Sequence, residues 1–149
     1  MNKLIFFLLG CLICFSGCAK EVEPEEYISE EEREVIRLVN EERTKVGITP
    51  LEMELSLMRS GDIRAEELTI LFSHDRPNGA SCFSVIEFES KASGENIAYG
   101  QPNANAVMAT WMNSAGHRNN ILNPNFTHIG VGYIYKNNTT YWVQLFVKK

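Results

Sequence analysis

Apolar residues recur at helical spacing in the segment that follows Ser29. Ser29 and Glu32 have the spacing of a capping box, in which each side chain bonds the other's backbone at the start of a helix. Apolar positions then continue on one face until Gly47 interrupts them. The pattern therefore predicts a first helix from about Glu30 to Val46.

Three further helices are indicated downstream. Apolar residues at helical spacing mark a second helix from residue 55 to residue 71 or 72, with Gly61 as an internal weak point. Ser81 can cap a short helix that carries the apolar residues of segment 83–88. A fourth helix is predicted from residue 103 or 105 to a stop at Gly116.

The last part of the chain changes to a period of two. Residues 128–135 and 140–147 are rich in β-branched and aromatic side chains, and the polar segment 136–139 between them suits a hairpin turn. Residues 97–99 are a third strand candidate. Both faces of the last strand carry large apolar groups, which requires helices on both faces of the sheet. We therefore expect an α+β fold, a three-layer α-β-α sandwich with a small antiparallel sheet.

The N-terminus has the pattern of an export signal. Lys3 precedes an uncharged apolar run over residues 4–15, which is shorter than the roughly 20 residues that a membrane-spanning helix needs. Ser16 and Gly17 before Cys18 resemble the bacterial lipobox, in which the cysteine is lipidated and becomes the first mature residue. We predict a lipoprotein signal peptide over residues 1–17 and an exported protein held at the cell membrane through Cys18. An ordinary secretory peptide cut nearby is the alternative.

The charge of the chain is concentrated in one segment. The 149 residues carry a net charge of −5, but the stretch 19–34 alone holds eight acidic and two basic residues. Residues 35–149 hold 11 of each sign. We interpret residues 18–28 as the lipidated cysteine with an acidic tether, and residues 29–149 as one nearly neutral domain. Because this domain lacks a basic footprint, nucleic acid is not an expected partner.

The cysteines point to a domain without disulfides. Cys11 and Cys14 lie in the predicted signal peptide and Cys18 is the predicted lipid attachment site, which leaves Cys82 alone in the domain. Cys82 follows a turn and has two interpretations. It is either a small core residue or a thiolate activated at a helix N-terminus.

Polar groups gather in three segments where the apolar pattern does not require them: 72–77, 94–97 and 111–118. In this order, and followed by 119–122 and 129–133, they resemble the motifs of the CAP superfamily. That superfamily comprises the cysteine-rich secretory, antigen 5 and pathogenesis-related-1 proteins. The resemblance is to its disulfide-free bacterial branch and covers about residues 30 to 149. It implies the CAP fold, an α-β-α sandwich with a central polar cavity.

The resemblance also implies which residues line that cavity. His74 and His117 match its two histidines, and Glu95 matches the glutamate of its Gly-Glu-Asn motif. Asn96 follows Glu95 in that motif. Ser114 stands where the family has a second glutamate, so only three of the four polar cavity positions carry ionisable groups.

Two imidazoles and one carboxylate are a ligand set for zinc with an open fourth position. We therefore expect His74, Glu95 and His117 to be able to bind Zn²⁺ or another divalent cation, with Asn96 and Ser114 lining the cavity. The three ligands are dispersed along the chain, so local spacing does not specify a metal. The alternative is a hydrogen-bonded polar cluster in which Glu95 orients a histidine.

The sequence favours binding over turnover and assigns no catalytic residue, because no serine lies in a nucleophile elbow. The expected function is a binding or envelope-interaction role, with an apolar small molecule, a peptide or an envelope protein as candidate partners. Two alternatives remain open. One is a metal-assisted hydrolase of peptide or cell-wall material with Glu95 as the base, and the other is a carrier of an apolar small molecule or lipid.

Overall fold

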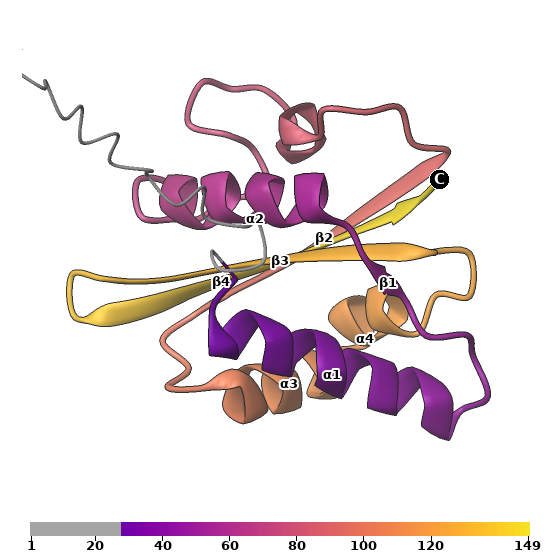
Figure 1. The fold of residues 1–149 in the computed structure, drawn as a ribbon. Helices are drawn as coiled ribbons and strands as arrows, with labels where there is room; N and C mark the ends of the chain where they lie inside the picture. Colours follow the sequence, from indigo (N-terminus) through magenta and orange to yellow (C-terminus); the bar gives the residue numbers. More distant parts are fainter. Residues whose placement is uncertain (1–27) are drawn as a thin grey trace, which may run out of the picture.

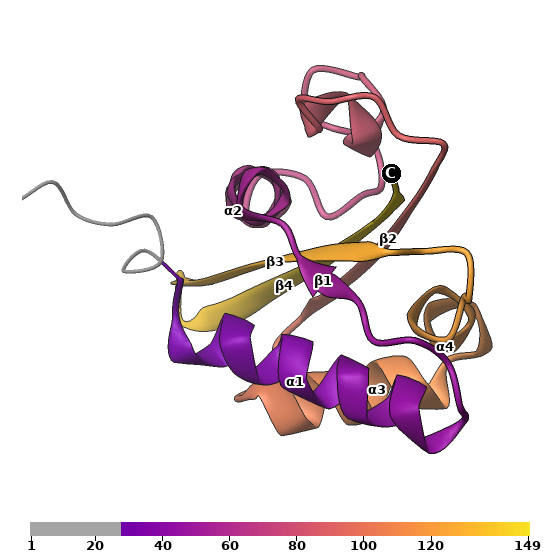
Figure 2. The same cartoon turned by 45° about the vertical axis from the view of Figure 1, so that its right-hand side comes forward.

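Helices cover both faces of a four-stranded sheet in the computed structural model, which describes residues 28–149. Helix α2 (Leu55–Leu68) packs on one face. Helices α1 (Glu30–Lys45), α3 (Ala104–Asn113) and α4 (Ala115–Ile121) lie on the other (Figures 1 and 2). The predicted α+β sandwich of three layers is confirmed. The predicted signal peptide over residues 1–17 and the lipidation site Cys18 lie outside the described residues.

The sheet has the order β1-β3-β4-β2. Its strands are β1 (Glu52–Met53), β2 (Ala92–Tyr99), β3 (His128–Lys136) and β4 (Thr139–Lys148). Strands β2, β3 and β4 pair antiparallel as expected, but the two-residue β1 pairs parallel to β3. The sheet is therefore mixed, and β2 is longer than the 97–99 segment that the pattern indicated. The hairpin turn between β3 and β4 is confirmed, with Asn137 and Asn138 at positive φ.

Strand β4 separates two hydrophobic cores. Trp142 and Phe146 point to the α1, α3 and α4 side, while Val143 and Leu145 point to the α2 side. All four are fully buried. Because successive side chains of a strand point to opposite faces, β4 contributes to both cores, as its apolar residues on both faces predicted. Ile28, the first described residue, packs against the larger core.

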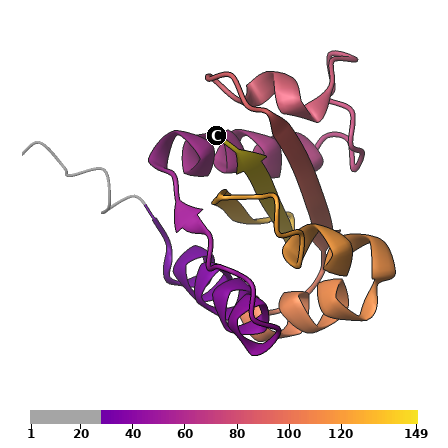
Figure 3. The ribbon, with the colours of Figure 1, turned by 90° about the vertical axis from the view of Figure 1, so that its right-hand side faces the viewer.

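Helix α2 lies unusually close to β3 because both carry glycine at the contact. A Cβ atom on Gly132 would overlap the carbonyl oxygen of Gly61, and one on Gly130 would overlap the backbone of Leu57. Gly61 is therefore a packing site for the sheet rather than a weak point of the helix. The α2 face is the upper layer in the side view of Figure 3.

Three helix boundaries differ from those predicted. Helix α2 ends at Leu68, and the short helix is a 3₁₀ turn, η2 (Cys82–Val85). The predicted fourth helix corresponds to α3, which ends at Asn113 because Ser114 adopts an extended conformation. The predicted stop at Gly116 is wrong, because Gly116 lies inside a further helix, α4, that starts directly after Ser114. Arg118 donates to the carbonyl oxygen of Met112 at 2.9 Å and so satisfies the end of α3. No helix within residues 28–149 has the length and apolarity to cross a bilayer.

Candidate functional site

The candidate site is built on β2, which is an edge strand of the sheet. Glu95 and Asn96 are consecutive in this strand, so their side chains point to opposite faces. Glu95 reaches Arg64 of α2, whereas Asn96 reaches the backbone of His117 in α4. One strand thus links the loop beyond α2 to the helix on the other side of the sheet.

A fully buried arginine holds the α2 side of the site. Arg64 donates from Nε to Glu95 Oε1 at 2.8 Å, from Nη1 to Glu67 Oε2 at 2.7 Å and from Nη2 to the Ser73 carbonyl oxygen at 2.8 Å. Burial alone would lower the pKa of Arg64, but its hydrogen bonds to Glu95 and Glu67 raise it above the ordinary arginine value. The bond to Ser73 fixes the segment that carries the next residue, His74.

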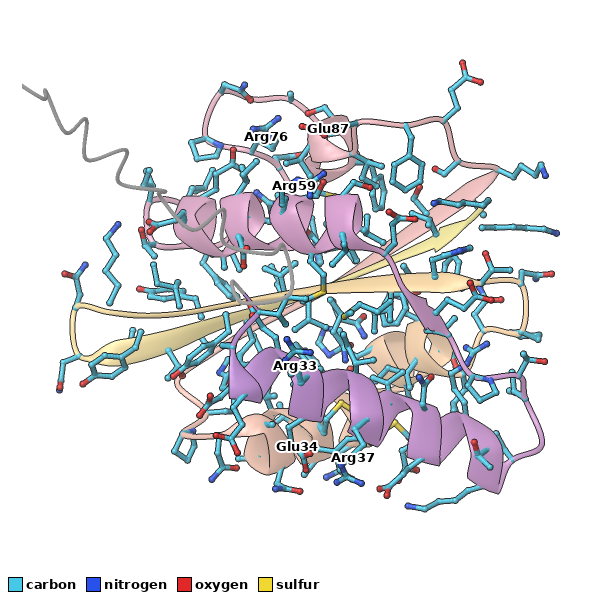
Figure 4. The ribbon with its side chains drawn as sticks, viewed as in Figure 1. Arg33, Glu34, Arg37, Arg59, Arg76 and Glu87 are labelled. Carbon is cyan, nitrogen blue, oxygen red and sulfur yellow. The ribbon has the colours of Figure 1, made fainter. Side chains whose placement is uncertain are left out.

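Glu67 extends this network toward the surface. Its Oε1 accepts hydrogen bonds from Nε of Arg76 at 2.8 Å and from Nη2 at 2.6 Å. Arg76 lies on the side of α2 that faces away from the sheet (Figure 4), and its Nη1 also donates to Ser84 at 3.2 Å. The two arginines therefore bond the two oxygens of the Glu67 carboxylate, and together they hold the loop between α2 and η2.

His74 is oriented by Glu95. Its Nδ1 lies 2.7 Å from Glu95 Oε2, and its side chain is 60% exposed whereas that of Glu95 is 1% exposed. A carboxylate partner favours the tautomer with the proton on Nδ1, which leaves a lone pair on Nε2. Both oxygens of Glu95 are thereby engaged, one by Arg64 and one by His74.

A network of side-chain amides holds the backbone of His117 in place. Asn96 donates from Nδ2 to the His117 carbonyl oxygen at 3.0 Å and to Gln144 Oε1 at 2.9 Å. Asn120 donates to Asn96 Oδ1 at 2.9 Å and to the Glu95 carbonyl oxygen at 3.2 Å. These bonds lock α4 to β2, so the position of His117 follows from the sheet.

The surroundings of His117 favour its neutral form. Burial lowers the pKa of His117, and the charge of a protonated His74 lowers it further. The Nδ1 atom of His117 is buried and has no hydrogen-bond partner. A buried polar atom without a partner is costly, so a bound ion or water is the kind of group that would satisfy it.

Hydrogen bonds join four of the five sequence-predicted residues at this strand, namely His74, Glu95, Asn96 and the backbone of His117. Within residues 28–149, no three His, Cys, Asp or Glu side chains are placed to share a metal ion. Glu95 lies behind His74 rather than beside an open position, which agrees with its interpretation as an orienting group. Ser114 starts α4 without a side-chain capping bond. Arg64 was not identified from the sequence, although a charged residue on the buried face of α2 could have indicated it.

Cys82 is buried beside this network and is not an activated thiolate. Burial and the neighbouring Glu95 raise its pKa to about 11. The four-residue η2 turn does not offset these effects, so the interpretation as a reactive thiol is wrong and Cys82 is a small core residue.

Two curated bacterial proteins are similar in sequence to this chain. Protein YkwD of Bacillus subtilis (strain 168) is 41% identical over 127 residues, which cover 82% of this chain and 49% of YkwD. Membrane protein YlbC of the same organism is 32% identical over 126 residues, covering 79% of this chain and 34% of its own length. The chain therefore spans at most about half the length of these curated relatives.

Solved structures share the fold. An extracellular protein with an SCP domain from Bacillus anthracis superposes with a TM-score of 0.73 at 27% identity, over 80% of this chain and 40% of that one. An outer surface protein from Borrelia burgdorferi gives a TM-score of 0.71 at 23% identity, over 78% and 91% of the two chains. The sequence model of the cysteine-rich secretory protein family, CAP, matches residues 36–146. The chain belongs to the CAP family and carries a domain of the type found in extracellular bacterial proteins.

Proposed function

We propose that this chain is an exported, lipid-anchored CAP protein that binds a divalent metal ion, such as Zn²⁺, through His74 and His117. The binding serves a recognition role at the cell envelope rather than turnover. One observation carries the metal proposal: a buried arginine and glutamate orient one imidazole, while the other imidazole has a buried nitrogen without a partner. The anchor rests on the lipobox-like residues before Cys18.

Two features of the histidines support the metal proposal. Histidine ligands commonly donate their second ring nitrogen to a carboxylate, which fixes the tautomer and raises the basicity of the ligating nitrogen. Glu95 stands in that position behind His74. Metal binding requires neutral imidazoles, and the lowered pKa of His117 favours the neutral ring. When bound, a divalent ion would supply open positions for an oxygen or nitrogen ligand of a partner.

The geometry favours binding over hydrolysis. A general base needs a lone pair directed at the proton that it removes, and both oxygens of Glu95 are bonded within the protein. A hydrolase would show turnover that collapses in Glu95→Gln. The carrier alternative instead predicts that lipid co-purifies with protein drawn from its own cells.

Calorimetric titration of metal-stripped protein with zinc tests the proposal. We expect one-site binding to the wild type and its loss in both His74→Ala and His117→Ala. His128→Ala is the matched control, because His128 begins β3 and bonds Thr127 at 2.8 Å, away from this network. Absence of heat with the wild type, or equal heat in all three variants, would contradict the metal site.

A further inference from the structure

A patch of exposed apolar and aromatic side chains lies beyond the C-terminal end of α2. Ile70, Leu71 and Phe72 are 75%, 44% and 44% exposed, and Tyr99 at the end of β2 is 58% exposed. The rings of Phe72 and Tyr99 pack edge to face with centroids 4.7 Å apart, and Tyr99 stacks on Tyr141 at 6.4 Å. We call these five residues the Phe72 patch. Contiguous exposed apolar groups of this kind mark interaction sites.

Two of the five patch residues lie on the sheet, and the other three follow the end of α2. Tyr141 of β4, which is half-buried, is paired in register with Tyr99 of β2 on one side and with Ile134 of β3 on the other. Tyr141 and Ile134 both pack against the α2-side core. Phe72 packs on Tyr99, so the sheet holds the aromatic part of the patch in place.

The chain enters the domain at the same end. Glu32 in the first turn of α1 accepts a hydrogen bond from the Tyr133 backbone at 3.1 Å, directly beside Ile134. Lys136 in turn pairs with Glu66 near the end of α2 at 2.7 Å. Figures 1 and 2 accordingly show the start of α1, the end of α2 and the β3–β4 turn at one end of the molecule.

The distance from Cys18 to this end is short. Ten residues lead from Cys18 to Ile28, and a chain of that length spans at most about 35 Å when fully extended. If Cys18 is lipidated, as the proposed function holds, the tether joins the domain at the end that bears the patch, so that end is within reach of the bilayer. The opposite end, where α1 finishes, lies farther from the point of attachment.

We propose that the Phe72 patch rests on the lipid bilayer, with its aromatic rings at the headgroup level. Tyrosine suits that depth because its ring is apolar and its hydroxyl stays hydrated. This proposal rests on the membrane anchor of the proposed function. It has a consequence for the site, because His74 follows Phe72 by two residues and so opens next to the membrane surface. The acidic tether repels anionic headgroups, so contact is strongest on zwitterionic lipid.

The test places the domain on a bilayer by chemistry that does not depend on lipidation in cells. Residues 18–149 are coupled through the Cys18 thiol to a maleimide-bearing phospholipid in phosphatidylcholine vesicles. Residues 28–149 contain both hydrophobic cores and every element of the sandwich, so this chain folds as a unit. Cys82 is buried and does not compete for coupling.

Tryptophan quenching by brominated phosphatidylcholine then reports contact. Phe72→Trp places a reporter in the patch, and Val46→Trp is the matched control, because Val46 is 56% exposed at the far end of α1. Trp111 and Trp142 are fully buried and give the same background in both. We expect brominated lipid to lower the added Phe72→Trp emission about twofold, as for a side chain in the interface, and to leave that of Val46→Trp unchanged.

Equal emission of Phe72→Trp on brominated and plain vesicles, or equal quenching of both variants, overturns the proposal. Dimerisation in sedimentation that Phe72→Ser abolishes, without quenching on vesicles, assigns the patch to a second copy of the chain instead. Failure of the proposed function is separate, since zinc binding is measured by calorimetry and lipidation of Cys18 by the mass of the native protein. Neither result alters the quenching.

Discussion

Replacing Arg64 with methionine tests whether the buried network organises the site. The side chains of Arg64 and Glu95 are 0% and 1% exposed, and the substitution removes three hydrogen bonds from Arg64. Methionine keeps much of the length of the side chain, so the main loss is electrostatic. Removing one partner of a buried ion pair leaves a desolvated charge, and we expect the free energy of unfolding to fall by about 3–5 kcal/mol.

Urea unfolding at pH 7, followed by the fluorescence of the buried Trp111 and Trp142, measures this loss. Arg59→Met is the matched control, because Arg59 is exposed on the outer side of the same helix (Figure 4); it should change stability by less than about 0.5 kcal/mol. The double variant Arg64→Met with Glu95→Met removes both charges and should recover at least about 1 kcal/mol relative to the sum of the single effects. A cost below about 1 kcal/mol for Arg64→Met, or strict additivity, would refute the reasoning.

Three further predictions concern packing, pH and the thiol. Gly132→Ala should lower the free energy of unfolding in urea by at least about 2 kcal/mol, because its Cβ would overlap the Gly61 carbonyl. Gly116→Ala in α4 meets no atom within 4 Å and should be neutral or stabilising in the same measurement. The pKa of His117 should lie below its ordinary value in an NMR titration. Because the unfolded chain then binds the proton more readily, stability is retained above the ordinary histidine pKa of 6.5 and lost as pH falls through it. His117→Gln should reduce that pH-dependent loss of stability. An upward shift of the His117 pKa would contradict this prediction. Cys82, with a pKa of about 11, should react with a disulfide reagent at pH 8 only as fast as the protein unfolds, and rapid labelling of the folded protein would contradict its burial.

The layers of the fold could be predicted from the sequence because they depend on local periodicity. The two apolar faces of the last strand were enough to require helices on both sides, and β4 fills both cores. The division of α3 from α4 was not predictable in this way. The chain breaks at Ser114, which is extended and is followed by a hydrogen bond from Arg118 back to Met112, and the run of helix-compatible residues through Ser114 gave no sign of it. The two-residue β1 exists only because β3 lies beside it.

The site was predicted in composition and not in connectivity. His74 and Glu95 follow from the resemblance to CAP proteins, and the structure joins them directly at 2.7 Å. The role of Glu95 depends on which groups occupy its two oxygens, and Arg64 comes to it from 31 positions earlier in the chain. Sequence spacing does not contain that contact. The same limit applies to Asn96, whose three amide contacts come from α4 and β4.

The most direct test of the metal site is the zinc-edge anomalous signal from crystals of the zinc-loaded protein. The account predicts one peak bonded to a nitrogen of His74 and a nitrogen of His117 at about 2.0–2.1 Å, with both oxygens of Glu95 still held by Arg64 and His74. A peak coordinated by Glu95 directly, a peak at His128, or no peak in zinc-loaded crystals would contradict it.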